Sequence, residues 1–151
     1  MEPLVYSYLE PVRQDAIAKF DANAPVQPIF DALVGLEQLS NVAKKEGLLA
    51  VEAEFAQGDS GTAIDDVADG VMLVVDGTFS EDIAEIMTNQ YWINKHQGND
   101  AMRQYLFIRG LLMIQEGKSI RVFEQILTSA LPKQFRCRPP LKRRSTPCQC
   151  R

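Results

Sequence analysis

Apolar residues recur every three or four positions along most of this chain, which is the spacing of one face of an α-helix. The pattern predicts a long amphipathic helix over residues 28–56, with a bend near Gly35 or Gly47. A shorter helix over residues 120–131 shows its buried face plainly, through Ile120, Phe123, Leu127 and Leu131. Helix rather than strand is therefore the main element of the predicted fold.

The same spacing continues between polar and glycine-rich breaks. It predicts four further helices, over residues 5–20, 62–76, 79–95 and 101–115. The five-residue apolar run 71–75 is ambiguous in isolation, but it continues the helical stripe that precedes it. We therefore expect an all-α fold, a single helical bundle of about five to six helices.

One turn can be predicted in detail. Gly77 suits the left-handed residue that follows a helix end, because glycine has no Cβ to clash there. Thr78 and Glu81 are three positions apart, which is the spacing of a capping box at the start of the next helix.

Composition divides the chain into three segments. With 151 residues, of which 46% are hydrophobic and 24% charged, one domain with one core is expected. Residues 1–27 form an N-terminal helix and hinge, 28–132 the main bundle and 133–151 a tail. The chain up to residue 132 has nine lysines and arginines against all twenty acidic residues, whereas the tail has seven basic residues and no acidic one. This basic, proline-containing tail is predicted to be disordered.

The tail also holds all three cysteines, at Cys137, Cys148 and Cys150. A structural zinc site needs four ligands, and these cysteines supply three with no histidine nearby, so no metal is expected. The basic cluster 141–144 would suit nucleic-acid phosphates or anionic lipids, although a replaced or out-of-frame C-terminus is the stronger interpretation. Nucleic-acid binding is thus not expected, and peripheral membrane association stays open.

The sequence gives little support to an enzyme. The only histidine, His96, lies in a polar turn, where a solvated side chain is the usual case. Asp65, Asp66 and Asp69 lack the order of a calcium loop and are better interpreted as first-turn acids of a helix. We expect no catalytic residues, no cofactor and no small-molecule substrate. No apolar run reaches the ~20 residues of a membrane span and no secretory signal is visible, so a cytoplasmic location is expected.

Three segments carry a family resemblance. Residues 36–52, which include the run Lys44-Lys45-Glu46-Gly47-Leu48-Leu49-Ala50-Val51-Glu52, are followed by residues 73–78 and then by residues 109–127, with Ile114-Gln115, Gly117 and Arg121-Val122. In this order they resemble the cytoplasmic segments of the flagellar motor stator proteins of the MotA/TolQ/ExbB proton-channel family. The membrane helices of that family are missing, so ion conduction by this chain is not expected.

The resemblance implies a contact surface. In stator proteins of this family a basic residue and a glutamate of the loop helix engage the rotor switch protein FliG. The matching positions here are Lys44 and Glu52, with Lys45 and Glu54 close by. Lys45 and Glu52 are seven residues apart, which would place them on one face of the predicted long helix.

Two functional interpretations follow. The chain is expected to be a stator-related interaction module that docks a rotor switch protein or stator subunits through this mixed-charge face. The alternative is a structural or self-associating helical bundle, a remnant without motor function, which would form homo-oligomers.

Overall fold

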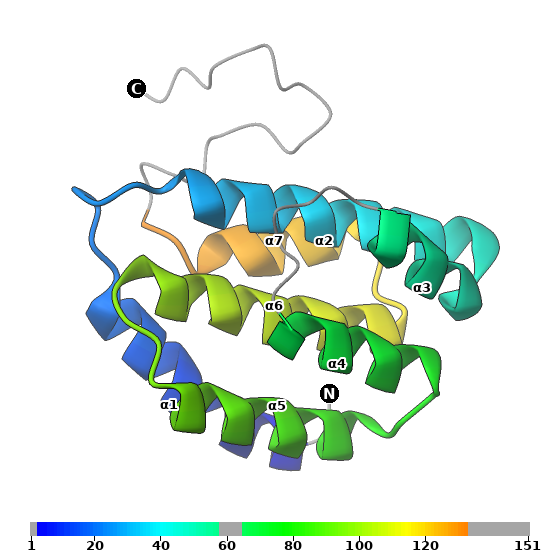
Figure 1. Ribbon diagram of the computed structural model, residues 1–151, viewed down its shortest axis with the longest axis horizontal. Coiled ribbons are helices and arrows are strands. Elements are labelled where there is room, and N and C mark those ends of the chain that lie inside the picture. The colour runs from blue at the N-terminus through cyan, green and yellow to red at the C-terminus, as the bar shows by residue number, and fades with distance from the viewer. Residues whose placement is uncertain (1–2, 58–64, 133–151) are drawn as a thin grey trace.

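The computed structural model describes residues 3–57 and 65–132, with the backbone alone at residues 3, 54–57 and 65–67 (Figure 1). This part of the chain is all-helical, as predicted. Its helices are α1 (Pro3–Lys19), α2 (Gln27–Glu46), α3 (Leu48–Gln57), α4 (Asp65–Val75), α5 (Ser80–Asn94), α6 (Asn99–Glu116) and α7 (Ile120–Ser129). The described residues thus contain seven helices, one more than the sequence pattern resolved.

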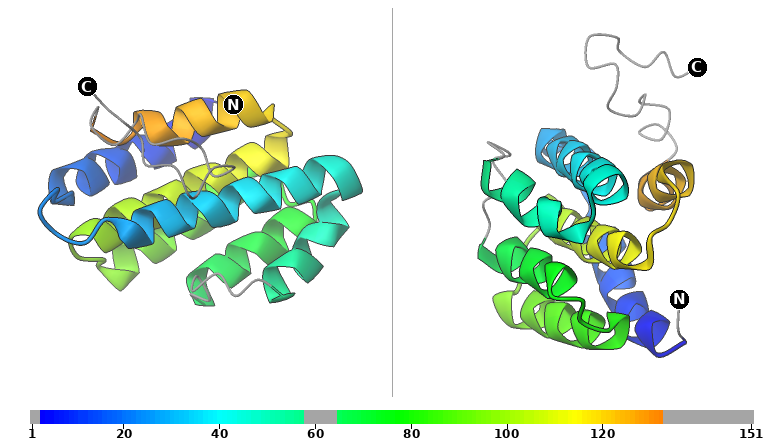
Figure 2. Two further views of the ribbon diagram at one scale, coloured as in Figure 1. Left: turned by 90° about the horizontal axis from the view of Figure 1, so that it is seen from above. Right: turned by 90° about the vertical axis from the view of Figure 1, so that its right-hand side faces the viewer.

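The additional helix arises at Gly47, which divides the predicted helix over residues 28–56. Its backbone has φ 93° and ψ 170°, a conformation that residues with a Cβ rarely adopt. The N–H of Gly47 donates to the carbonyl of Ala43 and closes the last turn of α2. Helix α3 then packs back against α2 instead of extending it (Figure 2). The prediction of one long helix is therefore wrong, and its bend at Gly47 is a full break.

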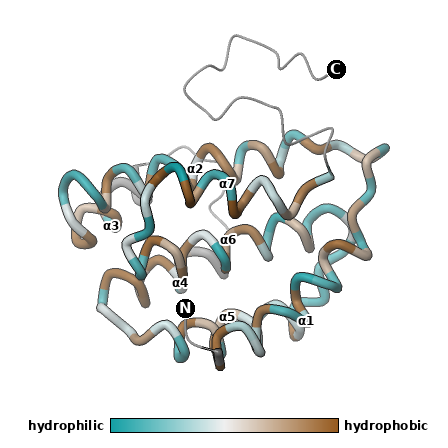
Figure 3. The backbone as a smooth tube through the Cα atoms, turned by 180° about the vertical axis from the view of Figure 1, so that it is seen from behind, coloured by the Kyte–Doolittle hydropathy of each residue, from teal (hydrophilic) through white to brown (hydrophobic). Residues whose placement is uncertain are grey.

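Helix α6 lies at the centre of the bundle and packs against α1, α2, α4, α5 and α7. Every residue from position 104 to position 114 is buried. A helix surrounded on all sides has no exposed polar face to maintain. The outer helices instead alternate hydrophobic and hydrophilic residues along their length (Figure 3). Most of the core is thus built around a single helix.

The N-terminal helix belongs to the same core. Val5, Leu9, Val12 and Ala16 are buried at helical spacing, and α1 packs against α5 and α6. Helix α1 therefore shares one packed bundle with the helices that follow.

The turn after α4 matches one sequence prediction and contradicts another. Gly77 has φ 75°, and the N–H groups of Gly77 and Thr78 donate to the carbonyls of Val74 and Leu73, which closes the helix end. The capping box predicted from Thr78 and Glu81 is absent, because α5 begins at Ser80 and its N-cap residue, Phe79, makes no side-chain cap. The helix starts one residue later than the motif requires.

The basic tail and its three cysteines lie outside the described residues. Among the residues that the structure does describe, no group of histidine, cysteine and acidic side chains could hold a metal ion. None of the helices α1 to α7 combines the length and the apolar character needed to cross a bilayer.

Candidate docking site

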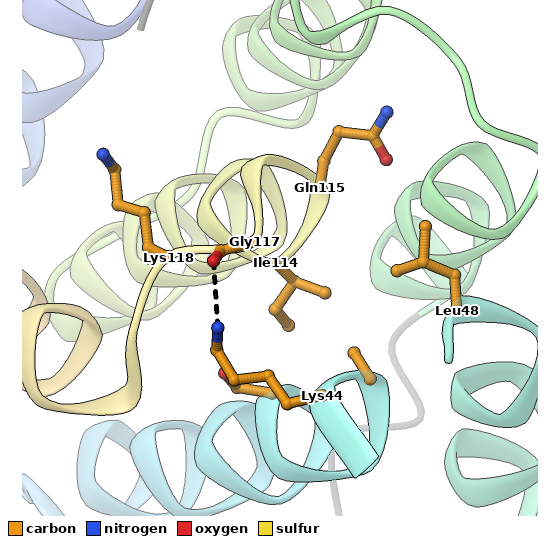
Figure 4. Close-up of a pocket in the computed structure, with 8 residues that line it drawn as sticks. Lys44, Leu48, Ile114, Gln115, Gly117 and Lys118 are labelled. Carbon is orange, nitrogen blue, oxygen red and sulfur yellow. Dashed lines mark hydrogen bonds between the residues drawn. The ribbon is translucent and has the colours of Figure 1, made fainter. Parts of the chain in front are cut away.

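Lys44 joins two of the three resembling segments. The side chain leaves the last turn of α2, and its Nζ donates a hydrogen bond to the carbonyl of Gly117, 2.9 Å away (Figure 4). Gly117 is the left-handed residue that ends α6, with φ 71°. The carbonyls at a helix C-terminus carry the negative end of the helix dipole, so a lysine ammonium is favourable there. Lys44 is nevertheless exposed and keeps further N–H donors for another group.

A small pocket of about 170 Å³ opens beside this hydrogen bond (Figure 4). It is lined by residues from the ends of α2 and α6 and the start of α3, which are Ser40, Ala43, Lys44, Leu48, Ile114, Gln115, Gly117 and Lys118. All eight belong to the resembling segments 36–52 and 109–127. The volume is below the ~300 Å³ at which small-molecule sites begin, so a side chain of a protein partner or a few waters would fit better than a cofactor.

Gln115 connects the remaining resembling segment, residues 73–78, to this pocket. Its Nε2 donates to the carbonyl of Thr78 at 2.7 Å, which ties the end of α6 to the turn between α4 and α5. The Oε1 of Gln115 is buried and has no hydrogen-bond partner among the described residues. Segments that are 37 and 73 positions apart in the sequence are therefore held together at one end of the bundle.

The four predicted partner-binding residues are not on one helix face. Lys44 and Lys45 lie in the last turn of α2, whereas Glu52 lies on α3, beyond the break at Gly47. Lys44, Lys45 and Glu52 are exposed, and the side chain of Glu54 lies outside the described residues. The predicted single-face geometry is wrong, because the intervening glycine ends the helix. The charges sit instead at the α2–α3 corner, which we define as Lys44, Lys45 and Glu52 with the adjoining pocket.

Further charges surround this corner. Lys118 lies 3.5 Å from a carboxylate oxygen of Glu116, and both side chains are partly buried. Glu46, next to Lys45, and Arg121, the second residue of α7, are also exposed. Exposed residues of both signs therefore lie in the segments that form this corner.

His96 is held in a structural network and is not solvated as expected. Its Nδ1 lies 2.8 Å from an Asp100 oxygen, and its side chain is only 10% exposed. The other oxygen of Asp100 accepts a hydrogen bond from Arg103 at 2.8 Å. Lys19 of α1 donates to the carbonyl of His96 at 3.1 Å. These bonds fasten the α5–α6 turn to α1, which gives the histidine a structural role.

The acidic cluster of α4 is only partly described. Helix α4 is described from Asp65 onward and the residues before it lie outside the described part, so the interpretation of these residues as first-turn acids stays a prediction. Asp69 is exposed, and the side chains of Asp65 and Asp66 lie outside the described residues.

Sequence reasoning missed one polar contact between helices. The hydroxyl of Tyr91 on α5 donates to a carboxylate oxygen of Asp15 on α1 at 2.6 Å. Burial raises the pKa of Tyr91 well above its ordinary value, and the hydrogen bond to Asp15 raises it further. Burial by itself would raise the pKa of Asp15 too, but the hydrogen bonds from Tyr91 and Lys19 outweigh it, and the pKa of Asp15 is lowered. The two residues are 76 positions apart, so no local pattern could pair them.

Comparison with known proteins gives no match to this chain, whether with family models, curated proteins or solved structures. The functional argument therefore depends on the residues of the α2–α3 corner and on the segments that the fold brings together there.

Proposed function

We propose that this chain is a stator-related interaction module that docks a flagellar rotor switch protein of the FliG type, or a stator subunit, through the α2–α3 corner. Lys44, Lys45 and Glu52 would make the charged contacts, with Glu54 as a fourth contact from the sequence prediction. No ion transport is part of this proposal.

The observation that carries the proposal is the meeting of the resembling segments. The Lys44 hydrogen bond to Gly117 and the Gln115 hydrogen bond to Thr78 link residues from all three segments at one end of the bundle. Their assembly around one exposed, charged corner supports a common contact surface.

The chemistry of the corner suits rapid and reversible docking. Exposed charges gain little stability for the fold itself, about 0 to 1 kcal/mol for each pair. Across an interface, complementary charges mainly speed the encounter and select the partner. Lys44 is well placed for this role because α6 orients its side chain while leaving the ammonium accessible.

Titration of the full-length protein with a purified rotor switch protein tests the proposal, with stator subunits tested in parallel. We expect binding at about 10 mM salt that weakens strongly at about 150 mM, since the screening length falls from about 30 Å to about 8 Å. Lys44→Glu and Glu52→Lys should each raise the dissociation constant about tenfold, because each places a like charge opposite the partner.

Two control variants distinguish an effect of the α2–α3 corner on binding from an effect of the net charge of the protein. Lys44→Arg keeps a cation and donors at the corner and should retain binding. Glu85→Lys makes the same charge change as Glu52→Lys, but on an exposed position of α5, and should bind like the wild type. Absence of binding to both partners at low salt would overturn the proposal, as would equal effects of Glu52→Lys and Glu85→Lys.

A further inference from the structure

One exposed line on α5 carries large apolar side chains. Phe79, the N-cap residue, and Ile86 and Ile93 on the helix are 79%, 38% and 76% exposed. Steps of seven residues are close to two helical turns, so the three side chains follow nearly one line along the helix. The opposite face of α5, with Ala84 and Thr88, is buried in the core. We call Phe79, Ile86 and Ile93 the α5 stripe.

The charges at the two ends of the α5 stripe have opposite signs. Asp76 is exposed in the turn that precedes α5, and Lys95 is exposed at the residue that ends it. The first turn adds Glu81 and Asp82 to the acidic end, while the last turn of the helix holds no acidic residue. The stripe therefore has an acidic beginning and a basic end.

The residues are also arranged symmetrically about Ile86. Phe79 and Ile93 lie seven positions before and after it, and Asp76 and Lys95 lie ten and nine positions away. A two-fold axis at Ile86 would place Phe79 opposite Ile93 of a second copy, and Asp76 close to Lys95 of that copy. A surface that complements itself under a two-fold rotation is what a symmetric dimer requires.

We propose that the α5 stripe is a self-association surface, on which α5 of a second copy of this chain lies antiparallel. Packing apolar side chains of two copies together removes their exposed area from water. The antiparallel direction pairs opposite charges at both ends, whereas a parallel pair would bring like charges together. Charge complementarity therefore favours a second copy of this chain as the partner and an antiparallel orientation of its α5.

The expected dimer is weak. The stripe exposes apolar area on the order of 400 Å², against about 800 Å² for each partner in a standard stable interface. The dimer should therefore form reversibly at micromolar concentrations and remain in equilibrium with the monomer. This proposal does not depend on the docking proposal, because α6 lies between α5 and α2 (Figure 1).

Sedimentation velocity of the full-length protein, at about 5 and 200 µM with a thiol reductant, tests this inference. The wild type should shift from monomer to dimer over this range. Ile86→Glu should abolish the shift, since the two-fold axis would bring two carboxylates together. Leu49→Glu makes a comparable change at an α3 position that is 78% exposed, and it should dimerise like the wild type. If Ile86→Glu does not fold, Ile93→Glu replaces it.

A charge-swap pair tests the orientation. Asp76→Lys and Lys95→Asp should each weaken the dimer about fivefold or more, because each brings like charges together at both ends. The double variant restores opposite charges and should recover dimerisation. A wild type that stays monomeric at the higher concentration, or a dimer that Ile86→Glu leaves intact, would overturn the proposal. A double variant that is no better than the single variants would overturn the antiparallel arrangement.

Discussion

Leu36 of α2 covers Gly110 of α6 so closely that the two helices leave no room for a methyl group. A Cβ placed on Gly110 would lie 2.7 Å from one δ carbon of Leu36 and 2.9 Å from the other. Both residues are buried, and Leu36 is fully excluded from solvent. Gly110 therefore sets how closely α2 approaches the central helix.

Gly110→Ala should destabilise the protein in spite of the better helix propensity of alanine. Overpacking a core costs about 1–3 kcal/mol, which outweighs the ~1 kcal/mol that alanine gains over glycine inside a helix. Gly35→Ala is the matched control, since nothing lies within 4 Å of its added Cβ. It should stabilise the protein by about 0.5–1 kcal/mol. Urea unfolding measures both changes, and a stabilised Gly110→Ala would contradict the close approach.

The Asp15 carboxylate should make stability depend on pH in the acid range. Because its pKa is lowered in the folded protein, its contribution is complete above a pH of about 4, the ordinary pKa of an unfolded aspartate, and is lost as pH falls through the lower folded value. The free energy of unfolding of wild type minus that of Asp15→Asn should therefore be larger at pH 7 than at about pH 3.

Tyr91→Phe checks the cause of that pH dependence. It removes the hydroxyl that donates to Asp15 while keeping the buried ring. It should cost about 1.5–3 kcal/mol at neutral pH, as expected for a hydrogen bond to a charged group. Part of the acid dependence should disappear with it, leaving the share due to Lys19. An acid dependence unchanged from wild type would mean that the Tyr91 hydrogen bond does not lower the pKa of Asp15.

Gly47→Ala should weaken the α2–α3 corner. A residue with a Cβ is strained at the φ of 93° found there, at a cost of about 1–3 kcal/mol. The same substitution at Gly35, inside α2, should have the opposite sign. Thermal unfolding followed by circular dichroism compares the two variants. If Gly47→Ala were as stable as Gly35→Ala, the helix break at Gly47 would not need a glycine conformation.

Ser119 should stabilise the start of α7. Its Oγ accepts a hydrogen bond from the N–H of Val122 at 3.4 Å, which satisfies a backbone donor at the helix N-terminus. Ser119→Ala should cost about 1 kcal/mol, and Ser119→Asp, which keeps an acceptor, should retain most of the stability. Denaturant midpoints measure the stability of both variants. Equal midpoints for Ser119→Ala and Ser119→Asp would mean that the cap contributes nothing.

The sequence predicted the helices well because their buried faces repeat locally. The buried face of α7 can be recognised from Phe123 and Leu127, which are four residues apart. The turn at Gly77 can be recognised from the conformational freedom of glycine. The break at Gly47 was underestimated because apolar spacing continues on both sides of it. Only the packing of α3 against α2 decides between a bend and a reversal.

Contacts between distant segments left no trace in the local pattern. The carbonyl of Thr78 accepts a hydrogen bond from Gln115, and its N–H closes the end of α4, so the residue belongs to the preceding turn and not to a capping box. His96 appeared solvated because its neighbours are polar, yet its carbonyl accepts a hydrogen bond from Lys19, 77 positions away, and Asp100 binds its ring. The proposed partner-binding residues were predicted from residues 36–56 alone, whereas Gly117 and Gln115 line the adjoining pocket from the end of α6.

The position of α6 near the C-terminal end of the described chain has a consequence for synthesis. Both α1 and α2 pack against α6, yet they end 97 and 70 positions before α6 ends, so they leave the ribosome well ahead of it. Until residue 116 has emerged, helices α1 to α5 have no complete central helix to pack against. The apolar faces that α1 and α2 turn toward α6 therefore stay uncovered by it until late in synthesis, and we expect the central core to pack when α6 appears.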